Sequence, residues 1–281
     1  MWGYLGGAHD ATGEDFRRAK QLIGTSAGSI VAARLAAGED PRRREERVRW
    51  DGESEPAQRP GALRMAIERA SRVSLGAFSP LAAPALSAAS PAGALARAAV
   101  LARVPRGRIA LDDLRSRVHA LGPSFDGRLR LVAVDRGSGR RVVFGDDGAP
   151  EARVADAVAA SCAVPGLFSP VLIGDREYVD GGVWSPTNLD LARAASADRV
   201  LCLVPTAVMG TGPALALRGL AAGWRIATSV EAAAAGRRGA GVEIVVPDGG
   251  SAAAMGTDLM NPARRARVLA EGFRQGAAGP L

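Results

Sequence analysis

The sequence predicts an α/β fold in three layers, with helices on both faces of a mainly parallel central sheet. Two observations lead to this prediction. Short apolar runs typical of strands alternate along the chain with longer segments of helical spacing. Several of these strand-like runs are apolar, as strands buried on both faces usually are. With 281 residues, 47% of them hydrophobic, the chain can bury a large core, and we expect one domain over residues 1–281.

The first expected elements are a strand, a tight turn and a helix. Gln21 to Ile23 is a short apolar run, and a glycine-rich turn follows it. Ile30 to Ala37 has the composition of a helix and is closed by Gly38, a residue type that commonly ends helices. Residues 39–105 combine charged stretches, prolines and segments of helical spacing. We expect them to form a helical insertion or cap beside the sheet.

After the insertion, strands and helices alternate. Leu111 to Leu121 has a helical face and is followed by Gly122, and the Arg-Gly-Ser-Gly turn at 136–139 predicts a hairpin. The other expected elements are strands at Leu129 to Val134, Arg141 to Phe144, Val171 to Ile173 and Tyr178 to Val179, apolar parallel strands at Val200 to Val204 and Val242 to Val246, and helices at Glu151 to Ser161, Pro186 to Ala195, Ala214 to Ala235 and Pro262 to Gln275.

The charge balance limits the classes of partner. The formal net charge is +7, and Lys20 is the one lysine among 36 basic residues. Positive charge favours contact with nucleic acid or anionic lipid. Aromatic residues are only 4% of the chain and no nucleic-acid-binding motif is present, so we expect no nucleic-acid partner. The basic stretch from Arg42 to Arg49 leaves two interpretations open, peripheral contact with an anionic membrane and a solvated helix face.

Cysteines and apolar segments bear on cofactors and location. Cys162 and Cys202 lie in apolar runs without metal-binding spacing, so we expect buried free thiols, no metal and no other cofactor. No apolar segment of roughly 18 residues lacks both charge and proline, which argues against a transmembrane helix. The first residues resemble no secretory signal. We therefore expect a cytoplasmic location, with peripheral membrane contact left open.

The strongest chemical signal is a G-x-S-x-G pattern formed by Gly24, Thr25, Ser26, Ala27 and Gly28. It lies between an apolar strand and an apolar helix, where a nucleophile elbow must lie. Small flanking residues suit the close approach of strand and helix. The N–H of Ala27 and the helix dipole would favour an oxyanion near Ser26. The alternative is an ordinary Gly/Ser-rich turn before a helix.

A nucleophilic serine needs a base, and the usual base is a histidine. The chain has two, His9 and His119. His119 lies on the polar side of a predicted helix, and His9 lies upstream of the serine, whereas an α/β-hydrolase places its histidine last. We therefore expect a carboxylate base. A Ser-His-Asp esterase stays open only if a histidine lies near Ser26.

Two carboxylates fit the end of a strand. Asp180 precedes Gly181 and Gly182, and Asp248 precedes a second Gly-Gly pair. The glycines allow a sharp turn that leaves the carboxylate at the strand end. Asp248 runs into a Gly-Gly-Ser-Ala-Ala segment that we expect to be flexible.

The GTSAG turn with SIVAARLAAG after it, together with the later YVDGGVWSPTN segment, resembles the patatin-like phospholipase family. Val158 to Phe168 is similar to the family's A-S-x-A-x-P-x-x-F/L stretch, and the resemblance extends to about Leu203. It implies a patatin-like fold and hydrolysis of lipid esters, including phospholipids. The family uses a Ser-Asp dyad and an acyl-enzyme without a histidine. Ser26 and Asp180 match the dyad's nucleophile and base, and Asp248 does not.

The resemblance also carries a departure. Trp2 to Gly13 resembles the helix before the family's elbow, so we expect the strand and the glycine-rich oxyanion loop that come earlier in the family to be absent from this sequence. Either the start codon is placed downstream of the true one, or the chain is a defective member that binds lipid or a partner. In both cases we expect an uncovered sheet position beside the Gln21 to Ile23 strand.

An exposed aspartate is a weak base, and burial in an apolar lipid cleft would raise its basicity. Residues 61–104 are rich in alanine, leucine and proline. They are expected either to line such a cleft or to pack as a helical cap.

Overall fold

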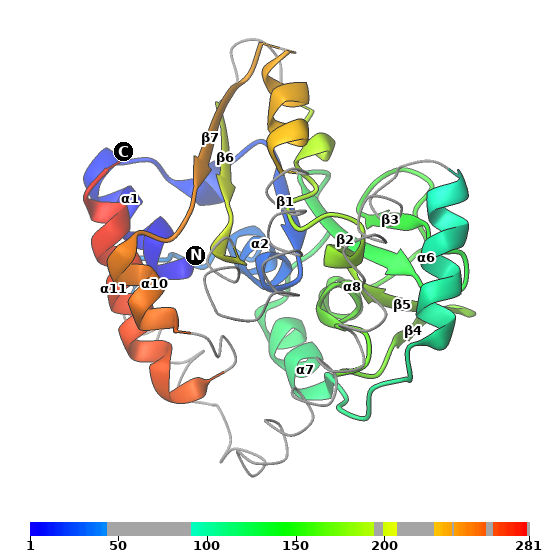
Figure 1. The fold of residues 1–281 in the computed structure, drawn as a ribbon. Coiled ribbons are helices and arrows are strands. Elements are labelled where there is room, and N and C mark those ends of the chain that lie inside the picture. Colours follow the sequence, from blue (N-terminus) through cyan, green and yellow to red (C-terminus); the bar gives the residue numbers. More distant parts are fainter. Residues whose placement is uncertain (44–90, 194–198, 207–227, 238, 257–260, 280–281) are drawn as a thin grey trace.

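The structure is a computed structural model. It describes residues 1–43, 91–193, 199–206, 228–237, 239–256 and 261–279. Helices and sheets alternate in an α/β arrangement (Figure 1), which confirms the predicted fold class. The division into a single domain stays a prediction, because most of the expected insertion, residues 44–90, lies outside the described residues.

The described residues form a five-stranded mixed sheet in the order β1-β2-β5-β4, with β3 on β2. Only β1 and β2 pair in parallel, while the β2–β3, β2–β5 and β4–β5 pairs are antiparallel. The sheet is therefore less parallel than the sequence predicts, because two of its pairs are hairpins closed by short turns. Within the described residues β1 pairs with β2 alone. The bounds are Leu22–Thr25 (β1), Leu129–Asp135 (β2), Arg141–Phe144 (β3), Val171–Ile173 (β4) and Arg176–Asp180 (β5).

A separate parallel pair consists of β6 (Arg199–Leu203) and β7 (Gly241–Val245). Their parallel pairing is confirmed. Their expected burial is wrong, because most of their residues are partly or fully exposed and Ile244 is 40% exposed. Glu243 interrupts the apolar run of β7, and a two-stranded sheet has little surface to bury.

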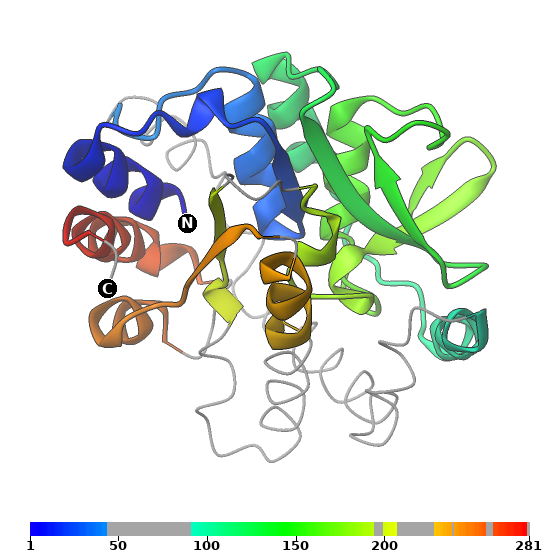
Figure 2. The same ribbon diagram turned by 90° about the horizontal axis from the view of Figure 1, so that it is seen from above.

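Helices cover both faces of the main sheet (Figure 2). Every residue of β2 is buried. Leu131 packs with residues of α2 (Ala27–Ala36), α7 (Asp112–Leu121) and α8 (Val154–Cys162), whereas Val134 packs with Leu101 of α6 (Pro91–Arg103). This alternation gives the three layers and explains why β2 is apolar along most of its length.

A third group of helices lies beside the sheets: α1 (Trp2–Thr12), α10 (Gly249–Met255) and α11 (Arg265–Ala277). Figures 1 and 2 both show α1 against α11. Glycines allow the contact, since a Cβ on Gly7 would collide with Phe273 O and one on Gly276 with Tyr4 O. None of the described helices is both long and apolar enough to span a membrane.

Several predicted boundaries change. The helix expected at Pro186 to Ala195 is wrong in its described part, residues 186–193: only a 3₁₀ turn, Leu189–Leu191, forms there, because Asn188 before it has a positive φ of 49°. The helix expected from Pro262 starts with a 3₁₀ turn before α11. Of the helix expected at Ala214 to Ala235, residues 207–227 lie outside the described residues, and 228–236 are helical.

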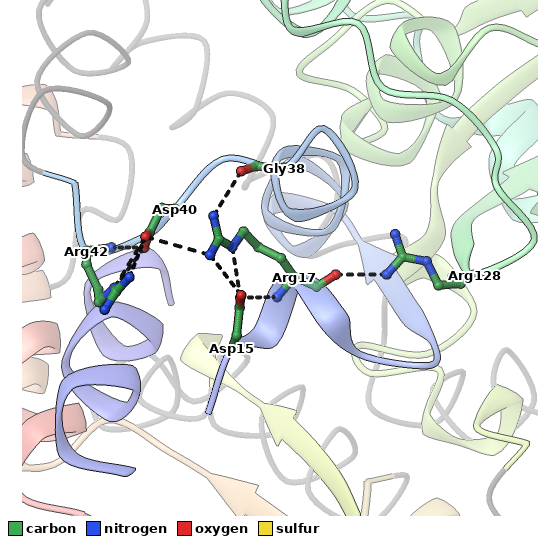
Figure 3. A network of polar contacts seen from close by, with 6 residues as sticks. All are labelled: Asp15, Arg17, Gly38, Asp40, Arg42 and Arg128. Atoms are coloured by element: carbon green, nitrogen blue, oxygen red, sulfur yellow. Dashed lines mark hydrogen bonds and ion pairs between the residues drawn. The ribbon is translucent and has the colours of Figure 1, made fainter. Parts of the chain in front are cut away.

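A polar network joins the segment before β1 to the end of α2 (Figure 3). Arg17 donates to Asp15 Oδ2 at 2.8 Å and lies 3.9 Å from Asp40 Oδ2, and Arg42 donates to Asp40 Oδ2 at 2.9 Å. Arg128, just before β2, donates to the carbonyl of Arg17 at 2.8 Å. The network therefore links the segments before β1, after α2 and before β2, which surround the strand-to-helix turn that follows β1.

We expect Asp40→Asn to lower the free energy of unfolding by roughly 1–2 kcal/mol at pH 7. Hydrogen bonds from Arg42 lower the pKa of Asp40 to about 2. A depressed carboxyl pKa stabilises the fold above the unfolded value near 4, and this stabilisation is lost as the pH falls towards 2. Urea unfolding at pH 7 and pH 2.5 tests this. Asp175→Asn is the control, because Asp175 is 96% exposed. Equal midpoints for wild type and Asp40→Asn at pH 7 would contradict the prediction.

Candidate active site

The turn at residues 24–28 is a strained strand-to-helix corner. β1 ends at Thr25, α2 begins at Ala27, and Ser26 between them has φ 52° and ψ −128°. Among the described residues, Asn188 is the one other non-glycine residue with a positive φ. Such a conformation costs about 1–3 kcal/mol and persists only where the surroundings enforce it. A corner of this kind exposes a serine hydroxyl at the end of a strand.

Glycines flank the corner, but packing requires only one of them. A Cβ on Gly24 would lie 2.5 Å from the Cα of Ser29, so a larger residue would push strand and helix apart. A Cβ on Gly28 would meet none of the described residues within 4 Å. Among the described residues, the expectation that close approach demands a small residue therefore holds at Gly24 and finds no such contact at Gly28.

The main chain of Ser26 is held on both sides. Its N–H donates to Ser161 Oγ at 3.0 Å, and the Ser161 hydroxyl donates in turn to the carbonyl of Val132 at 2.6 Å. The carbonyl of Ser26 accepts a hydrogen bond from Ser29 Oγ at 2.6 Å. These contacts enforce the strained conformation.

Asp180 ends β5 and is 5% exposed. Its Oδ1 accepts a hydrogen bond from the N–H of Gly182 at 2.7 Å, whereas Oδ2 is buried without a hydrogen-bond partner in the described part of the chain. A Cβ on Gly181 would collide with the carbonyl of Val132 and lie 3.2 Å from Thr25 Cγ2. Only glycine therefore lets the turn after Asp180 lie against β1 and β2.

The ionisation of Asp180 reflects its burial and its neighbours. Burial raises its pKa from 3.8 to about 6, and the side chain of Ser26 and the N–H of Gly182 oppose part of this rise. The side chain of Ser26 is therefore one of the groups that act on this carboxyl, although Oδ2 has no hydrogen-bond partner in the described part of the chain. A carboxyl group with a pKa near 6 is mostly ionised at pH 7 and is more basic than an exposed aspartate.

Asn188 links the loop after Asp180 to β1, the strand that leads to Ser26. No motif in the sequence predicts this contact. Its Nδ2 donates to Thr25 Oγ1 at 3.0 Å and to the carbonyl of Ser185 at 2.8 Å. Its Oδ1 accepts a hydrogen bond from Arg141 Nη1 at 3.1 Å. The side chain is fully buried, so these bonds fix the loop directly beside residue 25.

Asp248, the other candidate carboxylate, caps a helix. Its Oδ1 accepts a hydrogen bond from the N–H of Ser251 at 2.8 Å at the start of α10, and its Oδ2 pairs with Arg274. The hydrogen bond from Ser251 and the pairing with Arg274 lower its pKa. The expected flexible segment after Asp248 is wrong, since residues 249–255 are helical.

Neither histidine is bonded to the site. His119 is exposed on α7, as expected, and His9 is buried in α1. Within the described ranges no hydrogen bond or ion pair joins either histidine to Ser26 or Asp180.

Both cysteines are buried, and the described residues contain no group of side chains suited to hold a metal ion. Cys162 and Cys202 are buried free thiols, as predicted, and burial raises the pKa of each to about 12. Within the described part of the chain, no cluster of three or more His, Cys, Asp or Glu residues could hold a metal ion.

Fold and site together define an α/β protein with a serine on a strained strand-to-helix corner and a buried, basic aspartate beside it. The model of the patatin-like phospholipase family matches residues 2–193, more than half of the chain, and this range includes Ser26 and Asp180. The chain belongs to the patatin-like phospholipase family. Membership indicates a hydrolase of lipid acyl esters and implies lipid substrates.

Proposed function

We propose that this protein is a serine acyl hydrolase of lipid esters, phospholipids included, in which Ser26 is the nucleophile and Asp180 the base. The observation that carries the proposal is the state of Asp180. Its carboxyl group is buried, its pKa is raised to about 6, and its Oδ2 has no hydrogen-bond partner among the described residues. A free and basic oxygen next to a strained serine suits proton abstraction from the serine hydroxyl.

In the first half of the reaction, Ser26 Oγ attacks the ester carbonyl carbon and its proton passes to Asp180. The carbonyl oxygen becomes an oxyanion. Collapse of this intermediate breaks the ester C–O bond, the leaving alcohol takes the proton from Asp180, and the acyl group stays on Ser26. In the second half, Asp180 takes a proton from water, and the resulting nucleophile attacks the acyl-enzyme. The proton returns to Ser26 Oγ and the carboxylic acid is released.

Donors for the oxyanion come from the start of α2. The N–H groups of Ala27 and Gly28 lie in the first turn, where a helix offers no acceptor of its own. The helix dipole adds partial positive charge there. The N–H of Ser26 is not available, because it is bonded to Ser161. This assignment keeps Ala27 as the expected donor and adds Gly28.

We expect kcat/KM to rise about tenfold per pH unit below pH 6 and to level off above it. Asp180 must be ionised to accept a proton, and its pKa is about 6. Initial rates on a short-chain nitrophenyl ester between pH 4.5 and 8 test this, with the uncatalysed rate subtracted. Because a histidine would titrate in the same range, the profile is repeated with His9→Asn/His119→Asn.

The double histidine variant should keep the same midpoint. A midpoint near 4, or a profile that disappears with the histidines, would contradict Asp180 as the base. Hydrolysis itself separates the proposal from a protein that only binds lipid, since such a protein would bind vesicles without releasing fatty acid.

A further inference from the structure

The C-terminal end of α8 contacts both members of the proposed dyad, through Ser161 and through Ala163, the residue that follows the helix. Ser161 Oγ accepts the hydrogen bond from the N–H of Ser26 at 3.0 Å. Two residues later, the carbonyl of Ala163 accepts the hydrogen bond from the N–H of Asp180 at 3.0 Å. Cys162 between them lies with its Sγ 3.6 Å from Ser29 Oγ. No other helix among those described has bonds of this kind to both residues.

Residues 161–163 are held in place firmly enough to fix the positions of Ser26 and Asp180 relative to each other. Ser161 and Ala163 are fully buried, and the Ser161 hydroxyl is fixed by its own donation to the carbonyl of Val132 at 2.6 Å. A hydroxyl has one proton to donate. With that proton on Val132, the oxygen faces Ser26 as an acceptor, and the direction of both hydrogen bonds is set.

We infer that Ser161 is a positioning residue, which holds the strained backbone of Ser26 at a fixed distance from Asp180; this inference rests on the proposed function. The strained turn costs about 1–3 kcal/mol by itself and relaxes where nothing enforces it. Ser161 ties that turn to the same helix end that fixes the backbone of Asp180. It also occupies the N–H of Ser26, which leaves the oxyanion to Ala27 and Gly28.

The thiol of Cys162 does not act as a nucleophile in place of Ser26. It is buried, and burial together with the charge of Asp180 raises its pKa to about 12. At neutral pH it is a neutral side chain whose Sγ lies 3.6 Å from Ser29 Oγ. The functional group of this segment is therefore the Ser161 hydroxyl.

The test compares Ser161→Ala with Ser161→Cys and with a matched control, Ser169→Ala. Ser169 also donates its hydroxyl to a backbone carbonyl, that of Gly107 at 2.8 Å, but it does not contact the dyad. We expect Ser161→Ala to lower kcat roughly 10- to 100-fold with KM little changed, because small misplacements of reacting groups have effects of this size. Ser161→Cys, which keeps a weak acceptor, should recover part of the rate, and Ser169→Ala should keep the wild-type kcat.

A second readout does not depend on activity. Amide hydrogen exchange at Ser26, followed by ¹⁵N NMR, should be slow in the wild type and in Ser169→Ala, and faster in Ser161→Ala. Thermal unfolding checks that each variant is folded. An unchanged kcat, or an unchanged exchange rate at Ser26, in a folded Ser161→Ala would overturn the inference.

A failure of the proposed function gives a different result from a failure of the positioning role. If Ser26→Ala keeps its esterase activity, the dyad is wrong, whatever the Ser161 variants do. If Ser26 is essential and a folded Ser161→Ala keeps the wild-type kcat, only the positioning role is wrong.

Discussion

Replacing Ser26 by alanine is expected to remove ester hydrolysis, with a loss in kcat of roughly 10⁴-fold or more, and to leave the fold nearly intact. The side chain of Ser26 acts on Asp180, whereas the hydrogen bonds that hold the turn come from its main chain. Alanine keeps the Cβ and the same backbone strain, so the turn should persist. Release of nitrophenol from a short-chain ester measures the loss, and the melting temperature reports the fold.

Ser169→Ala again serves as the control, because it removes a hydroxyl outside the site. Retained turnover by Ser26→Ala would exclude this residue as the nucleophile. A variant that is inactive and also unfolded would be replaced by Ser26→Gly, since glycine adopts a positive φ without strain.

The second large effect is expected at Asp180. Asp180→Asn should lose activity as severely as Ser26→Ala, because the amide cannot accept the serine proton. Groups that act as one unit give non-additive losses, so Ser26→Ala/Asp180→Asn should be no slower than either single variant. Steady-state rates of the three proteins on one ester measure this.

Asp248→Asn is the matched control, since it changes the aspartate of the other Asp-Gly-Gly sequence. Asparagine is also a good helix N-cap, so α10 should persist and activity should stay near the wild-type level. If Asp248→Asn is the damaging substitution, the base has been assigned to the wrong aspartate.

Much of the site could be predicted because its signals are local in sequence. The Gly-x-Ser-x-Gly corner lies between a strand and a helix that are both visible as apolar runs, and the structure has β1 and α2 on either side of Ser26. The sequence ties a raised basicity of Asp180 to burial in an apolar lipid cleft, and Asp180 is buried at the end of β5. The rise in its pKa then follows from desolvation.

The rest depends on contacts between distant parts of the chain. The bond from Ser26 to Ser161 joins residues 135 positions apart, and the bond from Asn188 to Thr25 spans 163. No periodicity in the sequence marks such pairs. The helix expected at Pro186 to Ala195 does not form in residues 186–193 for the same reason, because Asn188 leaves helical geometry to make its buried hydrogen bonds.

The buried carboxyl group of Asp180 sets basicity against stability: the raised pKa that suits it to act as a base also makes the fold less stable when the group is ionised. A carboxyl group whose pKa rises on folding binds its proton more tightly in the folded chain, so ionisation opposes folding as the pH passes through about 6. A rise of about two pK units corresponds to roughly 3 kcal/mol between the two protonation states. The ionised carboxylate, which is the form ready to react, predominates at pH 7. The fold is nevertheless less stable with this form than with the protonated acid.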